Sequence, residues 1–240
     1  MGTDGKLQDP AVEPSIGLRR PLVATFVVLA VELGIAAYGF SRVPPGARVA
    51  VHWDASGHAN GYGDAFWAFL LIPGLTAAIS GLLAWLPSIE PRRRNLNLSG
   101  AAYRATWMSV LFLLAGVQAV IVLSALGWAQ SEVVSRLGPA GVGVVLIVVG
   151  NFLGKVRSNF FFGIRTPWTL SSELSWNRTH RLGGRLFVGL GLVAVATPFF
   201  PGAGVVALAA GVPAVIVVLF IYSYVEWKRD PAKVAVGRAG

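Results

Sequence analysis

Two histidines and two aspartates lie within one stretch of 13 residues, and their side chains are the ones in this chain best suited to bind a metal: His52, Asp54, His58 and Asp64. Imidazole and carboxylate are both zinc ligands, and a glycine-rich loop can bring them together. The spacing matches no established metal motif, however, and Asp54, Gly57 and Gly61 are equally typical of turns. The loop is therefore either the centre of a metal-dependent membrane enzyme, at His52, Asp54 and His58, or a set of turns that holds no metal.

Three further polar side chains interrupt long apolar runs: Glu32, Gln118 and Asn151. An acid near the centre of a membrane helix costs about 3 kcal/mol on an insertion scale, which the surrounding Leu, Ile, Val and Phe side chains roughly offset. Buried groups of this kind usually face one another or a cavity. They predict either hydrogen bonds between helices or, as an alternative function, a small transporter or proton-linked carrier that uses Glu32.

A basic segment covers residues 150–185, where one acid, Glu173, accompanies six cations: Lys155, Arg157, Arg165, Arg178, Arg181 and Arg185. Ser171 or Ser172 is placed to cap a helix with Glu173 in its first turn, where the helix dipole favours an acid. If that helix continues to residue 182, Arg178, Arg181 and Arg185 share one face. Such a face suits anionic lipid headgroups or a partner protein, and the same arginines can equally serve to fix the membrane topology.

Composition places the chain in the membrane. Of its residues 55% are hydrophobic and 13% charged, against roughly 25% charged in soluble domains. There is no cysteine, which excludes disulfides and thiolate metal sites. The sequence contains no G-x-S-x-G, H-E-x-x-H, Walker A or dinucleotide motif, so we expect neither an enzyme nor a cofactor. The net charge of +9 is explained by topology, and direct nucleic-acid binding is not expected.

Six apolar runs are candidate membrane spans: 22–40, 66–86, 103–127, 137–153, 186–200 and 205–224. The fifth has only 15 residues, so it must extend back over Gly183 and Gly184 or cross a thinned part of the bilayer. Residues 49–53 are a candidate short strand in the first loop. The expected fold is an all-α integral membrane protein with six transmembrane helices, a small extracellular loop and a long cytoplasmic loop.

The lysines and arginines predict the sidedness of these spans. With six spans, both termini and the loops after the second and fourth spans lie on one side, and 17 of the 20 Lys and Arg residues fall there. The opposite side holds Arg42, Arg48 and Arg136. Because cytoplasmic segments carry the excess of basic residues, both termini are predicted to be cytoplasmic in a multi-pass protein of the cell membrane.

Two stretches resemble one known family. The run GIRTPWTLSSELSWNRTHRLGG, with Asn151 and Asn159 upstream, resembles the SdpI family of bacterial membrane immunity proteins. The run VHWDASGHANGYGDAFWAFLLIP is similar to a domain of unknown function that commonly precedes it, with His52, Gly57 and Gly61 matching its motif. The family signature corresponds here to Asn159, Gly163, Arg165, Thr166, Pro167, Trp168, Trp176, Thr179 and His180. No second histidine, cysteine or close acid accompanies His180, so we expect it to make structural hydrogen bonds.

The resemblance implies a protein that protects its cell from a secreted peptide toxin. It also implies that the protein holds a cytoplasmic transcriptional repressor at the membrane. The chain divides accordingly into an N-terminal tail (1–21), two helices with the extracellular loop 41–65 (22–86), a basic loop with the third helix (87–136), the SdpI-like region with the cytoplasmic loop 154–185 (137–225), and a C-terminal tail (226–240). The expected partners are membrane lipids, a peptide toxin and such a repressor.

Overall fold

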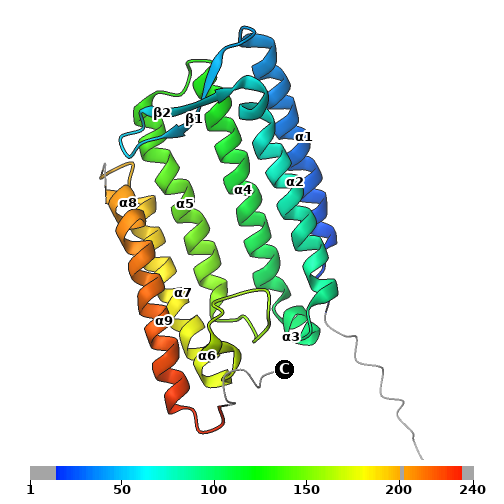
Figure 1. The fold of residues 1–240 in the computed structure, drawn as a ribbon, viewed down its shortest axis with the longest axis vertical. Coiled ribbons are helices and arrows are strands. Elements are labelled where there is room, and N and C mark those ends of the chain that lie inside the picture. The colour runs from blue at the N-terminus through cyan, green and yellow to red at the C-terminus, as the bar shows by residue number, and fades with distance from the viewer. Residues whose placement is uncertain (1–14, 201–202, 234–240) are drawn as a thin grey trace, which may run out of the picture.

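Six long helices run side by side along one axis of the computed structural model, which describes residues 15–200 and 203–233 (Figure 1). They are α1 (Arg19–Arg42), α2 (Ala65–Ile89), α4 (Gly100–Ala125), α5 (Ser131–Leu153), α7 (Glu173–Val195) and α9 (Val212–Arg229). The shorter elements are β1 (Arg48–Trp53), β2 (Ala59–Asp64), α3 (Arg93–Leu98), α6 (Pro167–Leu170), α8 (Ala203–Val206) and the π-helical turn η1 (Ala207–Gly211). We call the end that carries β1 and β2 the hairpin end, and the end that carries α3 and α6 the loop end.

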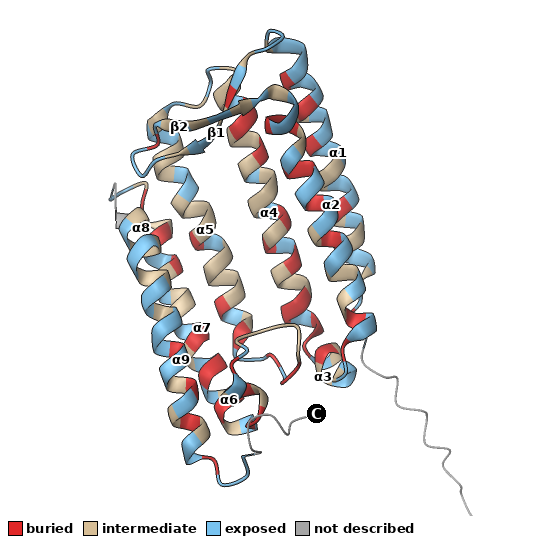
Figure 2. Ribbon diagram, in the orientation of Figure 1, coloured by how far each residue is buried: buried red, intermediate tan, exposed pale blue. Residues whose placement is uncertain are grey.

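The helices form two groups of three. In the first group, α1, α2 and α4 contact one another around Ala36, Phe69 and Ile121 towards the hairpin end and around Tyr103 and Trp107 towards the loop end. In the second group, α7 packs against both α5 and α9, and contacts between α4 and α5 join the groups. Figure 2 shows buried residues on the inner faces of these helices and exposed residues along the outer faces of α1, α2 and α9.

Glycines allow α5 and α7 to touch backbone to backbone. A Cβ atom added at Gly150 would lie 2.8 Å from the carbonyl oxygen of Gly184, and one at Gly184 would lie 2.6 Å from the carbonyl oxygen of Gly150. Gly143 and Gly191 repeat this relation, at 2.7 and 2.6 Å. The pairs are seven residues apart on each helix, which brings the same face round every two turns. Small residues at such positions are what close helix packing in a membrane requires.

The first loop forms an antiparallel hairpin, and the expected strand at 49–53 is confirmed within β1. Val49 is 2% exposed and packs into the core of the first helix group. Gly57, with φ +82°, lies at the turn, where an added Cβ would collide with the backbone of Ser131 at the start of α5. The hairpin thus covers α4 and touches the second helix group.

Five helical segments among the described residues are long and apolar enough to cross a membrane, which makes the chain a multi-pass membrane protein. Their outer faces expose large apolar side chains, such as Phe26 at 70%. On α2, Trp67 and Trp85 are both exposed and lie 18 residues apart, about 27 Å along a helix, close to the thickness of the hydrocarbon layer. Paired tryptophans at this spacing fit the two membrane interfaces.

The sixth long helix, α7, does not meet the same criterion, because its N-terminal half is polar. The structure joins the predicted helix after Ser172 to the predicted fifth span: one unbroken helix runs from Glu173 to Val195, so the irregular part of the 154–185 loop ends at Ser172. Residues 93–98 also form a short helix, between the second and third spans. The described chain begins and ends at the loop end (Figure 1). A sixth crossing through α7 and the cytoplasmic position of the termini remain predictions.

Candidate functional site

Asn159 organises the loop between α5 and α7, which we call the signature loop (residues 154–172). Its amide oxygen accepts hydrogen bonds from the backbone N–H groups of Phe161 (3.1 Å) and Phe162 (2.7 Å). Its amide nitrogen donates to the carbonyl groups of Arg157 (2.8 Å) and Phe162 (3.0 Å). The side chain is fully buried, and these four bonds use both its donor and acceptor groups. Asn159 therefore fixes the loop in one turn.

His180 connects α7 to the signature loop. Its Nδ1 lies 2.8 Å from the carbonyl oxygen of Trp176 and must donate, while its Nε2 accepts from the N–H of Ile164 at 2.9 Å. Only a neutral imidazole with its proton on Nδ1 satisfies both contacts. The ring stacks on Trp176 at 4.0 Å between centroids, and Gly163, with φ +118°, leaves no room for a Cβ beside Nε2. His180 thus makes the structural hydrogen bonds expected of it.

The short helix α6 begins with a reciprocal cap. The N–H of Thr169 donates to the Thr166 hydroxyl (3.1 Å), and the N–H of Thr166 donates to the Thr169 hydroxyl (2.9 Å). Pro167 occupies the first helical turn, where its missing N–H costs nothing. Trp168 packs against Phe220 and Tyr224 of α9, at 4.7 and 5.1 Å between ring centroids. Exposed Arg165 donates to the carbonyl of Phe160 at 2.6 Å and braces the loop.

The start of α7 is bonded to the end of α9. Ser172 is the N-cap: its hydroxyl oxygen accepts from the N–H of Ser175 at 2.9 Å, and the hydroxyl donates to Oδ2 of Asp230 at 2.5 Å. The predicted cap and the acid in the first turn are both found. The Ser172 hydroxyl, with backbone N–H groups, holds the pKa of Asp230 below its usual range. This contact ties the start of α7 to the end of α9.

One buried acid of α9 holds two arginines. Glu226 is 1% exposed, and its carboxylate pairs with Arg178 of α7 at 2.7 Å and with Arg229 at 3.3 Å. Neighbouring Thr179 is fully buried, and its hydroxyl has no hydrogen-bond partner among the described residues. Arg178 is therefore committed to α9, whereas Arg181 and Arg185, both exposed, border a groove between α5 and α7.

A second loop, from the other helix group, completes the site. The Glu90 carboxylate accepts the N–H of Phe160 at 3.1 and 3.2 Å, and Arg92 reaches the Ser158 hydroxyl at 2.5 Å. The Asn95 amide donates to the carbonyl of Ser158 at 2.8 Å. Sequence reasoning missed Glu90, Arg92, Asn95 and Glu226. A usable signal was present at Glu90, which is the only acid in the arginine-rich loop 87–102.

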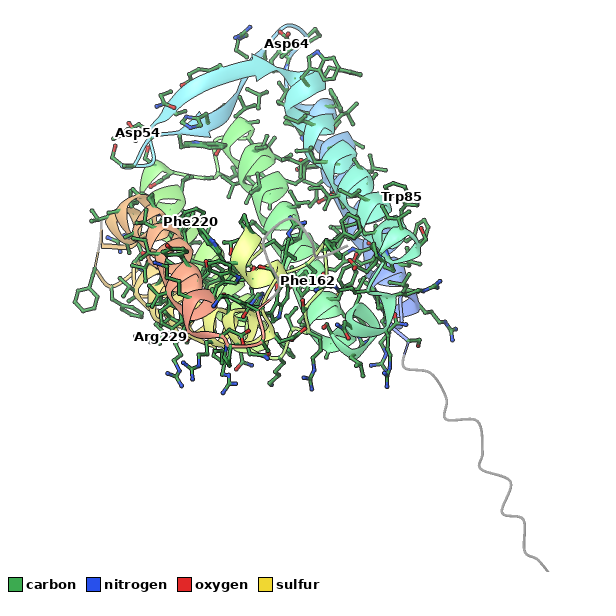
Figure 3. The ribbon with its side chains drawn as sticks, turned by 60° about the horizontal axis from the view of Figure 1, so that its bottom comes forward. Asp54, Asp64, Trp85, Phe162, Phe220 and Arg229 are labelled. Atoms are coloured by element: carbon green, nitrogen blue, oxygen red, sulfur yellow. The ribbon has the colours of Figure 1, made fainter. Side chains whose placement is uncertain are left out.

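Asp54 and His52, two of the candidate metal residues, make local hydrogen bonds within the hairpin. Oδ1 of Asp54 accepts from the N–H groups of Ser56 (2.9 Å) and His58 (3.0 Å), and the Ser56 hydroxyl, the largest influence, lowers the pKa of Asp54. Nδ1 of His52 lies 2.5 Å from Oδ1 of Asn60, and Gly61 sits against the His52 side chain. Asp54 and Asp64 lie at opposite ends of the hairpin (Figure 3). Within residues 15–200 and 203–233, no three His, Cys, Asp or Glu side chains gather as metal ligands.

The three intramembrane polar residues do not meet. Glu32 and Gln118 are both fully buried in the first helix group, where Glu32 accepts from Thr76 (3.0 Å) and Gln118 donates to the carbonyl of Phe69 (3.1 Å). Asn151 is exposed on α5, in the groove beside α7. A path through all three, as the carrier hypothesis requires, is not assembled. Glu32 and Gln118 make the contacts between helices that the other reading predicted.

Taken together, residues of the family signature and the neighbouring Thr169 build the loop end. Asn159, Gly163, Thr166, Thr169 and His180 act on the backbone of the loop, which they hold against α7 and α9. Basic side chains project outward around this end of the bundle (Figure 3). Such an arrangement, a rigid loop with a cationic surface, is suited to binding.

Comparisons with known proteins agree with the resemblance seen in the sequence. Residues 155–224 match the SdpI/YfhL protein family, and residues 25–77 match a domain of unknown function, DUF1648. The chain is 32% identical over 94 residues to Immunity protein SdpI of Bacillus subtilis (strain 168), a match that covers 39% of this chain and 44% of that protein. No solved structure matches the chain.

The family match begins inside the signature loop and ends in α9, so it covers nearly all of the signature loop and the whole of α7. The loop that carries Glu90, Arg92 and Asn95, and the last turn of α9 with Glu226, lie outside it. The DUF1648 match covers most of α1, the hairpin and half of α2. The chain is thus a multi-pass membrane protein in which residues 25–77 are similar to DUF1648 and residues 155–224 are similar to the SdpI/YfhL protein family.

Proposed function

We propose that this protein protects its cell against a membrane-active peptide, and that it acts by binding and not by catalysis. The observation that carries the proposal is the match to the family over residues 155–224, where several signature side chains hydrogen-bond to the backbone of one loop and hold its shape. The match to Immunity protein SdpI supports the same role, although it covers less than half of that relative. Side chains that bond to the backbone in this way shape a surface, which is what a binding role requires.

The hairpin end offers the peptide a place to bind. Beneath the hairpin lies a cleft of about 260 Å³, lined in part by Val49, Trp53, Tyr62 and Ser131. If the predicted topology holds, this cleft opens to the outside of the cell, where a secreted peptide arrives. The basic loop end then faces the cytoplasm, where it docks a repressor. Candidate repressors are proteins encoded beside this gene. A two-hybrid assay that compares their binding to the native chain and to the Arg165→Gln variant, which lacks one exposed charge of the loop end, tests that part of the proposal.

Complementation tests the protective role. The chain is expressed in Bacillus subtilis strain 168 from which SdpI has been deleted, and survival is counted in co-culture with the parent strain. We expect more survivors than with an empty vector, and fewer with Gly57→Ala, which would push the hairpin off α5. Gly46→Ala is the matched control, because Gly46 has a similar φ (+77°) but open space around it. Survival equal to the empty vector, at a membrane level equal to that of native SdpI, would contradict the proposal.

A further inference from the structure

A groove runs along the outer surface between α5 and α7, at the loop end of the bundle. Its volume is about 580 Å³, and its walls include Asn151, Lys155, Arg181, Arg185, Val188 and Leu192. Glycines at positions 154 and 189 contribute no side chains, so the space between the two helices stays open. The close contact of Gly150 with Gly184 forms part of the groove wall.

The loop end of this groove is positively charged. Lys155, Arg181 and Arg185 are exposed, and in the described part of the chain no carboxylate lies within 4.0 Å of their charged nitrogens. Arg178 differs, since Glu226 already neutralises it. Arg181 and Arg185 are four residues apart and therefore lie on one side of α7. Three cations without acids close by favour an anionic ligand.

Polarity changes along the groove in the way that a lipid's polarity changes. From Arg181 to Leu192 is 11 residues, about 16 Å along α7. The cations and Asn151 occupy one end, whereas Val188 and Leu192, the latter 58% exposed, occupy the end nearer the centre of the helix bundle. A free phosphate would use only the first end. A phospholipid matches both, with its phosphate among the cations and an acyl chain along the apolar part.

We propose that this groove binds one anionic phospholipid, of the phosphatidylglycerol class, from the membrane leaflet at the loop end. Its phosphate lies between Lys155, Arg181 and Arg185, and one acyl chain passes Val188 and Leu192 across Gly189. This binding goes beyond the protective role proposed above and does not depend on it. The bound lipid would occupy the α5–α7 surface beside the signature loop.

Native mass spectrometry of the purified full-length protein measures this binding directly. Phosphatidylglycerol and phosphatidylcholine are titrated separately, and the fraction of protein that carries one lipid is recorded. We expect the double variant Arg181→Gln/Arg185→Gln to weaken phosphatidylglycerol binding about tenfold or more, since each basic residue near an anionic surface contributes about fivefold. The control Arg93→Gln/Arg94→Gln removes two exposed charges from α3, at the same end but outside the groove, and should leave binding unchanged. Equal losses in both variants would overturn the proposal.

Two further arms separate the lipid from other occupants. Gly189→Leu fills the apolar part, where a Cβ meets nothing within 4 Å, and should weaken phosphatidylglycerol binding without lowering the unfolding temperature. Gly34→Leu, equally open on α1, is its control. Inorganic phosphate that displaces the lipid at millimolar concentration, or phosphatidylcholine that binds equally well, would overturn the proposal. The proposal would also be overturned if the native protein formed dimers that disappeared in Arg181→Gln/Arg185→Gln while lipid binding stayed the same. A second copy of the chain would then be the occupant of the groove.

Discussion

Replacement of Gly163 by alanine is the sharpest test of how the signature loop is held. The backbone conformation at φ +118° costs about 1–2 kcal/mol for a residue with a Cβ. The new methyl group would also collide with Nε2 of His180 and break its hydrogen bond with the N–H of Ile164. Leaving these buried groups unpaired costs about 1–3 kcal/mol more. We therefore expect Gly163→Ala to lower the free energy of unfolding by about 2–5 kcal/mol.

Gly46→Ala is the matched control, because φ is +77° there and nothing lies within 4 Å of the added Cβ. It should cost only the backbone penalty, about 1–2 kcal/mol. Thermal unfolding in detergent micelles compares the two variants. For a chain of this size about 1 kcal/mol corresponds to about 2–4 °C, so Gly163→Ala should unfold about 2–12 °C below the control variant.

A double-mutant cycle with His180→Ala identifies the source of the difference. Without the imidazole, the methyl group at position 163 keeps one close contact, with Trp176 at 3.3 Å, so its added cost should fall most of the way to that of Gly46→Ala. The reasoning is refuted if Gly163→Ala and Gly46→Ala unfold at the same temperature. It is also refuted if the extra cost of Gly163→Ala persists unchanged in the His180→Ala background.

Three further outcomes follow from the structure. Glu226→Gln should lower the free energy of unfolding by about 1–3 kcal/mol, because it removes a buried carboxylate that holds two arginines; Glu132→Gln, which breaks an exposed pair, should cost less than about 1 kcal/mol in the same thermal assay. The lowered pKa of Asp230 means that its carboxylate contributes stability that is complete above about pH 4 and is lost as the pH falls through the lowered pKa. In Asp230→Asn, the unfolding temperature should therefore fall less steeply below about pH 4 than it does in the native protein. The same pH dependence in both proteins would contradict this. Because the chain has no cysteine, single cysteines report topology: Ala55→Cys should react with an impermeant maleimide in intact cells and Leu98→Cys only after permeabilisation, and the reverse pattern would invert the predicted sidedness.

Apolar length and turn chemistry were enough to predict most of the helices and the strand in the first loop. They were not enough for α7, because they left open whether the helix expected to reach residue 182 joins the short fifth span across Gly183 and Gly184. In the fold Gly184 sits inside the helix and allows contact with Gly150. The segment 93–98 shows the same effect at smaller scale, since Asn95 is typical of turns but donates to the carbonyl of Ser158 from within a helix. Tertiary contact decides both cases.

The site was predictable only in part for a related reason. The cap at Ser172 and the role of His180 are local, and their residue types indicate them. The separation of Asn151 from Glu32 and Gln118 depends on how the helices are arranged laterally, which the order of spans does not specify. The ion pair of Arg178 likewise depends on Glu226, which lies 48 residues away. Glu226 follows the last apolar run and belongs to no motif, so the sequence does not indicate this pair.

The hydrogen bonds from Glu90, Arg92 and Asn95 to the signature loop also bear on how this protein can be divided. A fragment limited to the C-terminal half would leave the N–H of Phe160 and the carbonyl of Ser158 without the acceptor and donor that the N-terminal half supplies. Swapping halves between relatives would meet the same obstacle unless the two loops were exchanged as a unit. For engineering, the pair of loops is therefore the unit that must be moved together, even though a long stretch of chain separates them.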